Sequence, residues 1–372
     1  MKILILSASI GSGHTRAAQA IATAFVSRGE PDIEVIDFMS TEVSRFNQFL
    51  KRLYLSILAW IPDLYDRIYR LAGVRRVGPF TRLLWSTLMY LPFNRLISKR
   101  KPDVIVCTHP FPEAAAALWK FLHARSAGQF LLAAVLTDYS LHEIWLYGEV
   151  DVYFVATPEM KLELERHSTQ RQKIFATGIP ISMRNAQCVM RNEVLATPNY
   201  ELRITNYALL VMGGGLGLGS IEETLQKIDT LELPISITVV AGRNEKLAAR
   251  LKSMKFRHPI EVLGFVDNVK ELMERATLLI TKPGALTMTE AFALGLPMLL
   301  HAPIPGPEAL NARYAVRRGA AISLADGEDI AESIAELFRD RRKLAAMSDA
   351  AFRLSRAAAA EIAEHLSMKE AN

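Results

Sequence analysis

The chain has 372 residues, of which 50% are hydrophobic and 22% are charged, which excludes a largely disordered polypeptide and predicts two domains. Its two cysteines, Cys107 and Cys188, cannot build a disulfide framework and favour a reducing compartment. The apolar stretch after Lys2 is too short for a signal peptide. The sequence contains no run of about 18 apolar residues, so we expect no membrane-spanning helix.

The net charge of +5 is unevenly distributed. Residues 45–101 hold twelve Lys or Arg and two acidic residues, a local charge of +10, so the rest of the chain carries −5. The same segment holds ten of the thirty aromatic residues. A basic, aromatic and helical segment is typical of an element that rests on an anionic membrane surface. The candidate membrane contacts are Trp60, Arg75, Arg76, Trp85, Lys99, Arg100 and Lys101.

Two other interpretations of this segment stay open. Its aromatic side chains can pack against the N-terminal sheet, or its basic residues can bind nucleic acid. No nucleic-acid module pattern is present, so we expect no nucleic-acid partner.

In the first half of the chain, apolar runs alternate with helical patterns. Helices are expected at 15–28, at 114–125 and over much of 45–100, with breaks at Pro62, at Gly78-Pro79 and at Pro92. The expected strands are KILIL, DIEVIDF, PDVIVC, FLLAAVL and VDVYFVA. Strands that alternate with helices predict a parallel sheet, and unbroken apolar runs predict strands covered on both faces.

The alternation starts again after a polar stretch at 191–204 that contains Pro198 and has little periodicity. We therefore expect an N-terminal domain at 1–190, a linker at 191–204 and a C-terminal domain at 205–372. Helices such as SIEETLQKI and EKLAARLKSM lie between the strands of this second series. Those strands are YALLVM, ISITVV, IEVLGF, ATLLIT and LPMLL.

A glycine-rich turn, MGGGLGLGS, joins the first of these strands to a helix. Glycines let the backbone approach a phosphate closely, and the helix start offers free N–H groups with a partial positive charge. The turn lacks the Gly-Lys-Ser/Thr of a Walker loop and the later acidic residue of the dinucleotide fingerprint. The candidate phosphate contacts are Gly214, Gly215, Gly217 and Gly219.

A second turn, TKPGALTMTEA, follows the strand ATLLI. The N–H groups of residues 284–287 can hold a diphosphate, and Glu290 lies on a helix face that can reach a ribose. A capped helix with Glu290 as a surface charge is the alternative, but two turns on neighbouring strand ends favour a ligand. The candidates here are Lys282, Gly284, Ala285, Leu286, Thr287 and Glu290.

The loop PIPGPEALNARY follows the last expected strand. A carboxylate and an amide three residues apart suit paired sugar hydroxyls, although an acidic residue also simply stabilises a helix start. The candidates are Pro305, Gly306, Glu308 and Asn311.

Taken together, MGGGLGLG, AGRN, GFVDN, TKPGALTMTEA and IPGPEALNARY resemble the C-terminal half of the monogalactosyl- and processive diacylglycerol glycosyltransferases. That group belongs with the lipid II-forming N-acetylglucosaminyltransferase in glycosyltransferase family 28. In the N-terminal half, SASIGSGHTRAAQAI resembles the group's glycine-glycine-histidine turn. LTDYSLHEIWLYGEVDVYFVATPEMK resembles another of its motifs, so the similarity spans nearly the whole chain.

The resemblance implies an α/β protein of the GT-B class, with two facing Rossmann-like domains and the active site in the cleft between them. It implies inverting transfer of a hexose from a UDP-sugar to a lipid hydroxyl, above all that of diacylglycerol, giving a β-glycoside. The implied partners are the UDP-sugar, the lipid acceptor and an anionic membrane. The implied location is the cytoplasm, at the inner face of the cell membrane.

The resemblance also implies roles for single residues. Phe265 and Val266 would lie against the uracil, and Glu290 would bind ribose. The two glycine turns would hold the diphosphate. The remaining roles fall to Glu308 and Asn311 on the sugar, Arg243 and Asn244 near the donor, His14 as base, and Gly11, Ser12 and Gly13 on the acceptor side.

Three departures from the family pattern leave the sugar unidentified. Leu216 stands where many diacylglycerol members have an acidic residue, and Pro307 stands where Gln is common. The GALT wording at 284–287 is nearer to the lipid II enzyme.

An inverting displacement needs a base for the acceptor hydroxyl. His14 suits this task because its unperturbed pKa is about 6.5, and Asp138 is its expected partner. The chain contains no Asp-x-Asp, so we expect no metal or other cofactor and assign the leaving diphosphate to backbone N–H groups. His109, His142 and His301 also lie near strand ends, but their spacing does not indicate a metal site.

Three alternatives remain open at this point. One is a UDP-sugar epimerase of similar architecture, and another is a glycosyltransferase with a polyprenyl-linked or other acceptor. The third is a binding protein without enzymatic activity.

Overall fold

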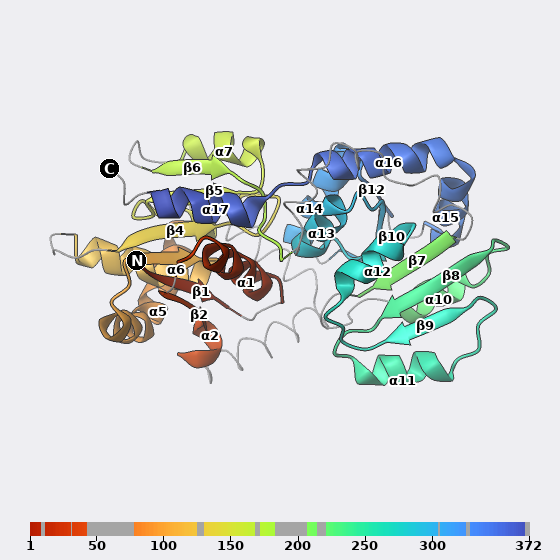
Figure 1. Cartoon of the computed structure of the whole chain (residues 1–372), viewed down its shortest axis with the longest axis horizontal. Helices are drawn as coiled ribbons and strands as arrows, with labels where there is room; N and C mark the ends of the chain where they lie inside the picture. Colours follow the sequence, from red (N-terminus) through yellow and green to blue (C-terminus); the bar gives the residue numbers. More distant parts are fainter. Residues whose placement is uncertain are drawn as a thin grey trace. The chain divides into compact units, whose positions relative to one another are not determined.

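The computed structural model forms two compact units (Figure 1). The first unit holds the described residues up to Ser182 and again from Arg356 onward, and the second holds most of those between. Among the described residues, no helix is long and apolar enough to cross a membrane. The structure describes residues 1–8, 12–30, 32–42, 78–124, 130–167, 172–182, 207–213, 221–303, 306–324 and 328–368.

The first unit is built on a parallel six-stranded sheet with the order β2-β1-β3-β4-β5-β6. The strand order reverses between β1 and β3, which is where open α/β sheets bind ligands at the carboxyl edge. Strand β6 was not predicted, because it is short and partly polar. The strands are β1 (Lys2–Ser7), β2 (Asp32–Asp37), β3 (Val104–Cys107), β4 (Leu131–Val135), β5 (Val152–Val155) and β6 (Lys173–Ala176).

Helices cover this sheet. Helix α1 buries Ala18, Ile21, Ala22 and Phe25, whose spacing of three and four places them on one face. Helix α5 packs against α6, and both helices lie in the chain between β2 and β4. The helices are α1 (Ser12–Ser27), α2 (Phe38–Thr41), α5 (Gly78–Arg100), α6 (Pro110–Leu122), the 3-10 helix η1 (Glu143–Trp145), α7 (Pro158–Glu165) and α17 (Ala358–Ser367).

Helix α17 belongs to the first unit, although the sequence placed all of 205–372 in the C-terminal domain. It packs beside α1 and adds Ile362, Ala363 and Leu366 to the core that α1 shares with the first sheet (Figure 1). The expected C-terminal limit of the second domain is therefore corrected: the last helix buries its apolar face on the other unit. The expected linker at 191–204 lies outside the described residues.

Helix α5 runs through Pro92, where the sequence predicted a break. Proline removes one backbone hydrogen bond and disfavours a helix, but a long helix that packs on a neighbour can absorb that cost. The expected break at Gly78-Pro79 coincides with the start of α5. The break expected at Pro62 lies outside the described residues.

The second unit is also built on a parallel six-stranded sheet, with the order β12-β11-β10-β7-β8-β9. Counted within the unit, this is the Rossmann order, and it reverses between β7 and β10. The strands are β7 (Tyr207–Met212), β8 (Ile235–Val240), β9 (Ile260–Leu263), β10 (Leu278–Thr281), β11 (Met298–Leu300) and β12 (Ala321–Ser323).

The apolar core of the second unit lies between this sheet and its helices, and includes Val211, Ile237, Ile280 and Leu299 from four neighbouring strands. The α/β class with two Rossmann-like units is thus confirmed. The helices are α10 (Ile221–Ile228), α11 (Glu245–Ser253), α12 (Val269–Arg275), α13 (Ala285–Ala293), α14 (Pro307–Arg317), α15 (Ile330–Arg339) and α16 (Arg341–Arg353).

Candidate functional site

In the second unit, the two glycine turns leave adjacent strand ends. Met212 of β7 pairs with Thr281 of β10, and the Thr281 hydroxyl donates to the Met212 carbonyl at 3.1 Å. The chain therefore enters both turns at the point where the strand order reverses. Four predicted contacts in the first turn, Gly214, Gly215, Gly217 and Gly219, lie outside the described residues.

The second turn leads directly into α13. Gly284 caps this helix with extended backbone (φ −68°) and no side-chain hydrogen bond. The N–H groups of Ala285, Leu286 and Thr287 have no acceptor one turn earlier within the helix, so they carry the partial positive charge of its start. A Cβ atom added to Gly284 would meet no atom within 4 Å, so packing does not demand glycine there. Close approach of a ligand would demand it.

Three side chains stand around this turn. Lys282 is buried, and its Nζ lies 3.6 Å from Oε2 of Glu308 in the first turn of α14. Asn311 is also buried, and its Nδ2 donates to the Pro283 carbonyl at 3.3 Å. In this structure Asn311 therefore holds the backbone of the turn.

Four other predicted donor contacts follow β8 and β9. The Arg243 guanidinium carbon lies 5.1 Å from the centroid of the Phe265 ring, and that side chain is 51% exposed. An exposed aromatic ring next to a guanidinium offers a flat surface on which a nucleobase such as uracil can stack. Val266 beside it is partly buried. Asn244 has a structural role, because its Oδ1 caps α11 by accepting from the Leu247 N–H at 3.0 Å.

The remaining donor candidates are placed by α13 and by the approach to α14. Glu290 is partly buried within α13, beyond the helix start that Gly284 caps. Gly306 has φ 94°, a left-handed conformation that glycine adopts readily. Pro305 lies outside the described residues.

In the first unit, the sequence suggested that His14 lies in the turn before α1. In the structure it lies within α1 itself. Ser12 and Gly13 also belong to this helix, while Gly11 lies outside the described residues. The ring Nδ1 of His14 is 2.8 Å from the Thr108 carbonyl oxygen and 2.8 Å from the Thr137 hydroxyl. A carbonyl can only accept, so Nδ1 carries the hydrogen. The neutral ring then holds its lone pair on Nε2, as a general base requires.

The electrostatics keep this imidazole neutral. Burial lowers the pKa of His14 below its usual 6.5, while the Asp138 charge and the Thr108 carbonyl act in the opposite direction. Asp138 thus acts on His14 through its charge. Thr108 and Thr137, which hold the ring, were missed because nothing in the sequence relates them to His14 except that each follows a strand.

A second imidazole packs on His14. The His109 ring meets it edge-on, with the centroids 4.5 Å apart. Nδ1 of His109 accepts from the Phe111 N–H at 3.1 Å and so caps α6. Burial, followed by the electrostatic influence of the neighbouring His14 ring, holds the pKa of His109 well below its usual value. His109 therefore stays neutral and fixes the start of α6.

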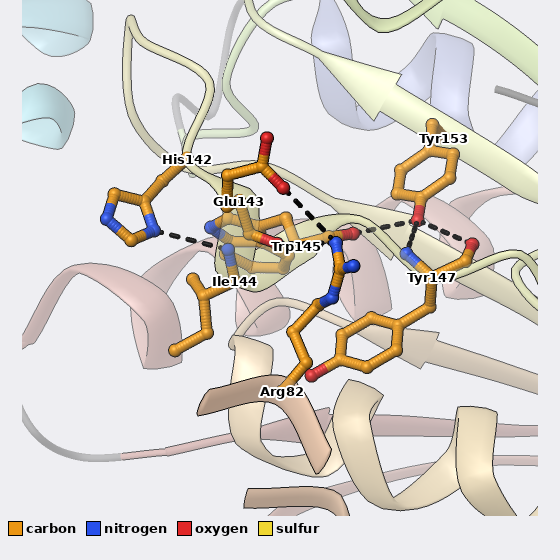
Figure 2. A network of polar contacts seen from close by, with 7 residues as sticks. All are labelled: Arg82, His142, Glu143, Ile144, Trp145, Tyr147 and Tyr153. Carbon is orange, nitrogen blue, oxygen red and sulfur yellow. Dashed lines mark hydrogen bonds and ion pairs between the residues drawn. The ribbon is translucent and has the colours of Figure 1, made fainter. Parts of the chain in front are cut away.

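The motif stretch between β4 and β5 is tied to its surroundings by the polar contacts in Figure 2. Arg82 of α5 forms an ion pair with Glu143 at 3.3 Å. The Tyr153 hydroxyl donates to the Trp145 carbonyl at 2.7 Å, and the His142 ring caps η1. These family-like residues therefore hold the loop after β4 in place.

Comparison with known proteins adds the family. The Monogalactosyldiacylglycerol (MGDG) synthase family matches residues 14–181, and the Glycosyltransferase family 28 C-terminal domain matches residues 208–366. A processive diacylglycerol beta-glucosyltransferase of Bacillus cereus is 32% identical over 361 residues, which cover 94% of this chain and 88% of that protein.

The chain belongs to the diacylglycerol glycosyltransferase family. The resemblance inferred from the sequence is thereby confirmed, and so is the assignment as a glycosyltransferase.

Solved structures share the fold of this diacylglycerol glycosyltransferase family member. MurG from Acinetobacter baumannii matches with a TM-score of 0.62 and 18% identity, covering 99% of this chain and 100% of that one. A putative UDP-N-acetylglucosamine 2-epimerase from Listeria monocytogenes matches with a TM-score of 0.60 and 15% identity, covering 99% and 97%. At such identities the likeness shows the fold alone, so the epimerase match does not indicate epimerase activity.

The residues of this glycosyltransferase that we expected to contact a membrane differ in their surroundings in the structure. Trp85 is partly buried and stacks on Phe111 of α6, with the ring centroids 4.2 Å apart. Its role in a membrane contact stays a prediction. Arg100 pairs with Glu34 at 2.7 Å, whereas Lys99 and Lys101 are exposed. Trp60, Arg75 and Arg76 lie outside the described residues.

No described residues bring three His, Cys, Asp or Glu side chains together in a way that could hold a metal ion. The expectation that transfer needs no metal stays a prediction.

Proposed function

We propose that this enzyme transfers a hexose from a UDP-sugar to the hydroxyl of diacylglycerol, with inversion to a β-glycoside. The observation that carries the proposal is the tautomer of His14, whose Nδ1–H is held by Thr108 and whose Nε2 is left as the base. The name of the Bacillus cereus relative, a diacylglycerol beta-glucosyltransferase, supports diacylglycerol as acceptor and favours glucose as the sugar.

In this mechanism the acceptor hydroxyl gives its proton to Nε2 of His14 while its oxygen attacks C1 of the sugar. The bond from C1 to the diphosphate oxygen breaks in the same step, and UDP leaves with the extra negative charge. The Thr108 carbonyl and the Asp138 charge stabilise the imidazolium that forms. The N–H groups at the start of α13 stabilise the leaving diphosphate.

The outer face of α5 supports peripheral attachment to a membrane. Five large apolar side chains on this face are 45–67% exposed. Their spacing of three and four residues places them along one stripe, and the exposed Arg95 and Lys99 follow toward the helix end. An apolar stripe next to basic residues suits the headgroup region of an anionic membrane. The five are Phe80, Leu83, Leu84, Leu88 and Leu91.

We place this attachment at the cytoplasmic face of the cell membrane. The donor is water-soluble and the acceptor lies in the bilayer, so an enzyme that rests on the surface can reach both. The active site would then take its acceptor from the membrane surface.

The proposal is tested by incubating the purified protein with one UDP-hexose at a time and dioleoylglycerol in anionic vesicles, in the presence of a chelator. Mass spectrometry should detect a hexosyl diacylglycerol, and the coupling constant of the anomeric proton should show the β-configuration. His14→Ala serves as the control without a base. Conversion of the sugar nucleotide in the absence of acceptor would show an epimerase instead. Product that forms only with a divalent ion would contradict the metal-free mechanism.

A further inference from the structure

An unpaired polar atom lies beside the turn between β10 and α13 in the second unit. His301 directly follows β11, and its backbone N–H donates to the Thr281 carbonyl at 3.1 Å. The residue is only 8% exposed, and its Nε2 is buried without a hydrogen-bond partner. Buried polar atoms in folded proteins are nearly always paired, so an unpaired one next to a binding turn points to a missing ligand.

Lys282 is the charged neighbour of this imidazole. Burial lowers the pKa of His301, and the Lys282 ammonium lowers it further, so the ring is neutral at physiological pH. Nζ of Lys282 lies 3.6 Å from Oε2 of Glu308, and the two side chains are only 9% and 19% exposed. A charge-assisted hydrogen bond is normally about 2.7–2.9 Å long. At 3.6 Å the Lys282–Glu308 contact is a long ion pair and not a close charge-assisted hydrogen bond, so an incoming anion can compete for the ammonium.

The three groups differ in the ligand chemistry that they suit. An ammonium at the start of α13 suits a diphosphate, whereas a carboxylate and a neutral imidazole suit hydroxyl groups. Glu290 and the exposed Phe265 ring are assigned to the ribose and the base, so the hexose is the part of the donor that remains for Glu308 and His301.

We propose that His301 is a further donor-recognition residue, whose Nε2 hydrogen-bonds a hydroxyl of the hexose while Lys282 turns from Glu308 to the diphosphate. This inference rests on the function proposed above. Donor binding would pair the buried Nε2 and release the Glu308 carboxylate to a second hydroxyl. A bound UDP without a hexose would engage Lys282 but leave His301 unpaired.

The test measures equilibrium binding by calorimetry without acceptor, using UDP, UDP-glucose and the four monodeoxy analogues of UDP-glucose. His301→Leu removes the polar atom, and His301→Gln keeps an amide near the position of Nε2. His258→Leu is the matched control, because Nε2 of His258 is already paired with the Leu231 carbonyl at 2.8 Å. Thermal unfolding of each variant checks that it is folded.

The wild type should bind two monodeoxy analogues about tenfold more weakly than UDP-glucose, one lacking the hydroxyl bound by His301 and one lacking the hydroxyl bound by Glu308. His301→Leu should bind UDP like the wild type, bind UDP-glucose about tenfold more weakly, and lose the discrimination against one of these two analogues. His301→Gln should keep part of this discrimination. It replaces the Leu variant in the test if that variant does not fold. Lys282→Met should weaken UDP and UDP-glucose alike.

Two results would overturn the inference. If every deoxy penalty is the same in the wild type and in the His301 variants, His301 does not read the hexose, although the proposed function stands. If the wild type binds no UDP-hexose at all, the proposed function and this inference both fail.

Discussion

At the scale of single residues, the proposed base is held by groups that are distant in the sequence. His14 could be named from its motif, because few residues titrate near neutral pH. Its tautomer could not be predicted, since it depends on the Thr108 carbonyl, which is 94 residues away along the chain. The contact of Asn311 was equally unpredictable from the sequence. We assigned this residue to the sugar, and in the structure its side chain donates to the Pro283 carbonyl.

The lowered pKa of His14 predicts the pH dependence of transfer. The base must be neutral, and burial moves its pKa below 6.5, so kcat/KM should be flat through neutral pH and fall with a midpoint below 6.5. His14→Ala should reduce kcat/KM by roughly 10²- to 10⁴-fold, remove this acid limb and leave UDP affinity unchanged. Initial rates from pH 5 to 9 and UDP calorimetry test this. A variant that keeps the wild-type limb would exclude His14 as the base.

Glu290 and Glu308 should separate nucleotide binding from sugar selection. Glu290→Ala should weaken UDP binding by about tenfold, because it removes the charged hydrogen bond that we predict to the ribose. Glu308→Ala should leave UDP binding intact, since it only releases Lys282, but should reduce the ratio of kcat/KM between UDP-glucose and UDP-galactose. Calorimetry and competition assays measure the two effects. Normal UDP affinity in Glu290→Ala would show that its placement is wrong.

At the scale of elements, α5 shows what composition can and cannot predict. The basic charge, the aromatic content and the helix itself were evident from the sequence. The direction of each face was not, because apolar residues occur all around the helix: Trp85 packs inward on Phe111, while Leu84 and Leu91 point to solvent. Among the described elements, packing against α6 and η1 decides which face of α5 is buried.

The exposed stripe of α5 should drive attachment to vesicles. Replacing Leu83, Leu84, Leu88 and Leu91 together with Gln should strongly reduce flotation with anionic vesicles and lower turnover of membrane-embedded acceptor, with UDP affinity unchanged. The apolar contribution scales with buried area and is not screened by salt, whereas the basic contribution is screened, so added salt should weaken wild-type binding only in part.

The matched control for this experiment is Leu162→Gln, because Leu162 is an equally exposed leucine (58%) on α7 of the same unit. It should float like the wild type. Equal flotation of the wild type and the four-residue variant would remove α5 from the membrane contact, and equal binding to neutral and anionic vesicles would remove the electrostatic part.

At the scale of the whole molecule, the repeated alternation of strands and helices was enough to predict two Rossmann-like units. The allocation of the last helix was not predictable. Helices α15, α16 and α17 all have apolar faces, and the pattern of such a face does not reveal which sheet covers it. The short strands β6 and β12 were missed because three or four partly polar residues give no clear periodicity.

The placement of α17 predicts where a core mutation acts. Leu366→Asp puts a charge into the core of the first unit and should destabilise that unit by about 3 kcal/mol or more. Hydrogen exchange should quicken in α1 and β5 and stay unchanged in the strands of the second unit. Met368→Asp, at an exposed position two residues later, is the control and should change neither. Faster exchange in β7 or β10 would contradict the assignment of α17.

The same placement fixes an order of events during synthesis. The ribosome makes the strands of the first sheet early, but the side chains of Ile362, Ala363 and Leu366 that complete its core emerge last. Chains are elongated at about 5–20 residues per second, so the early half waits for roughly ten seconds or more with part of its apolar surface uncovered. The second unit, made later, has all its strands and helices before α17 emerges and can finish folding first.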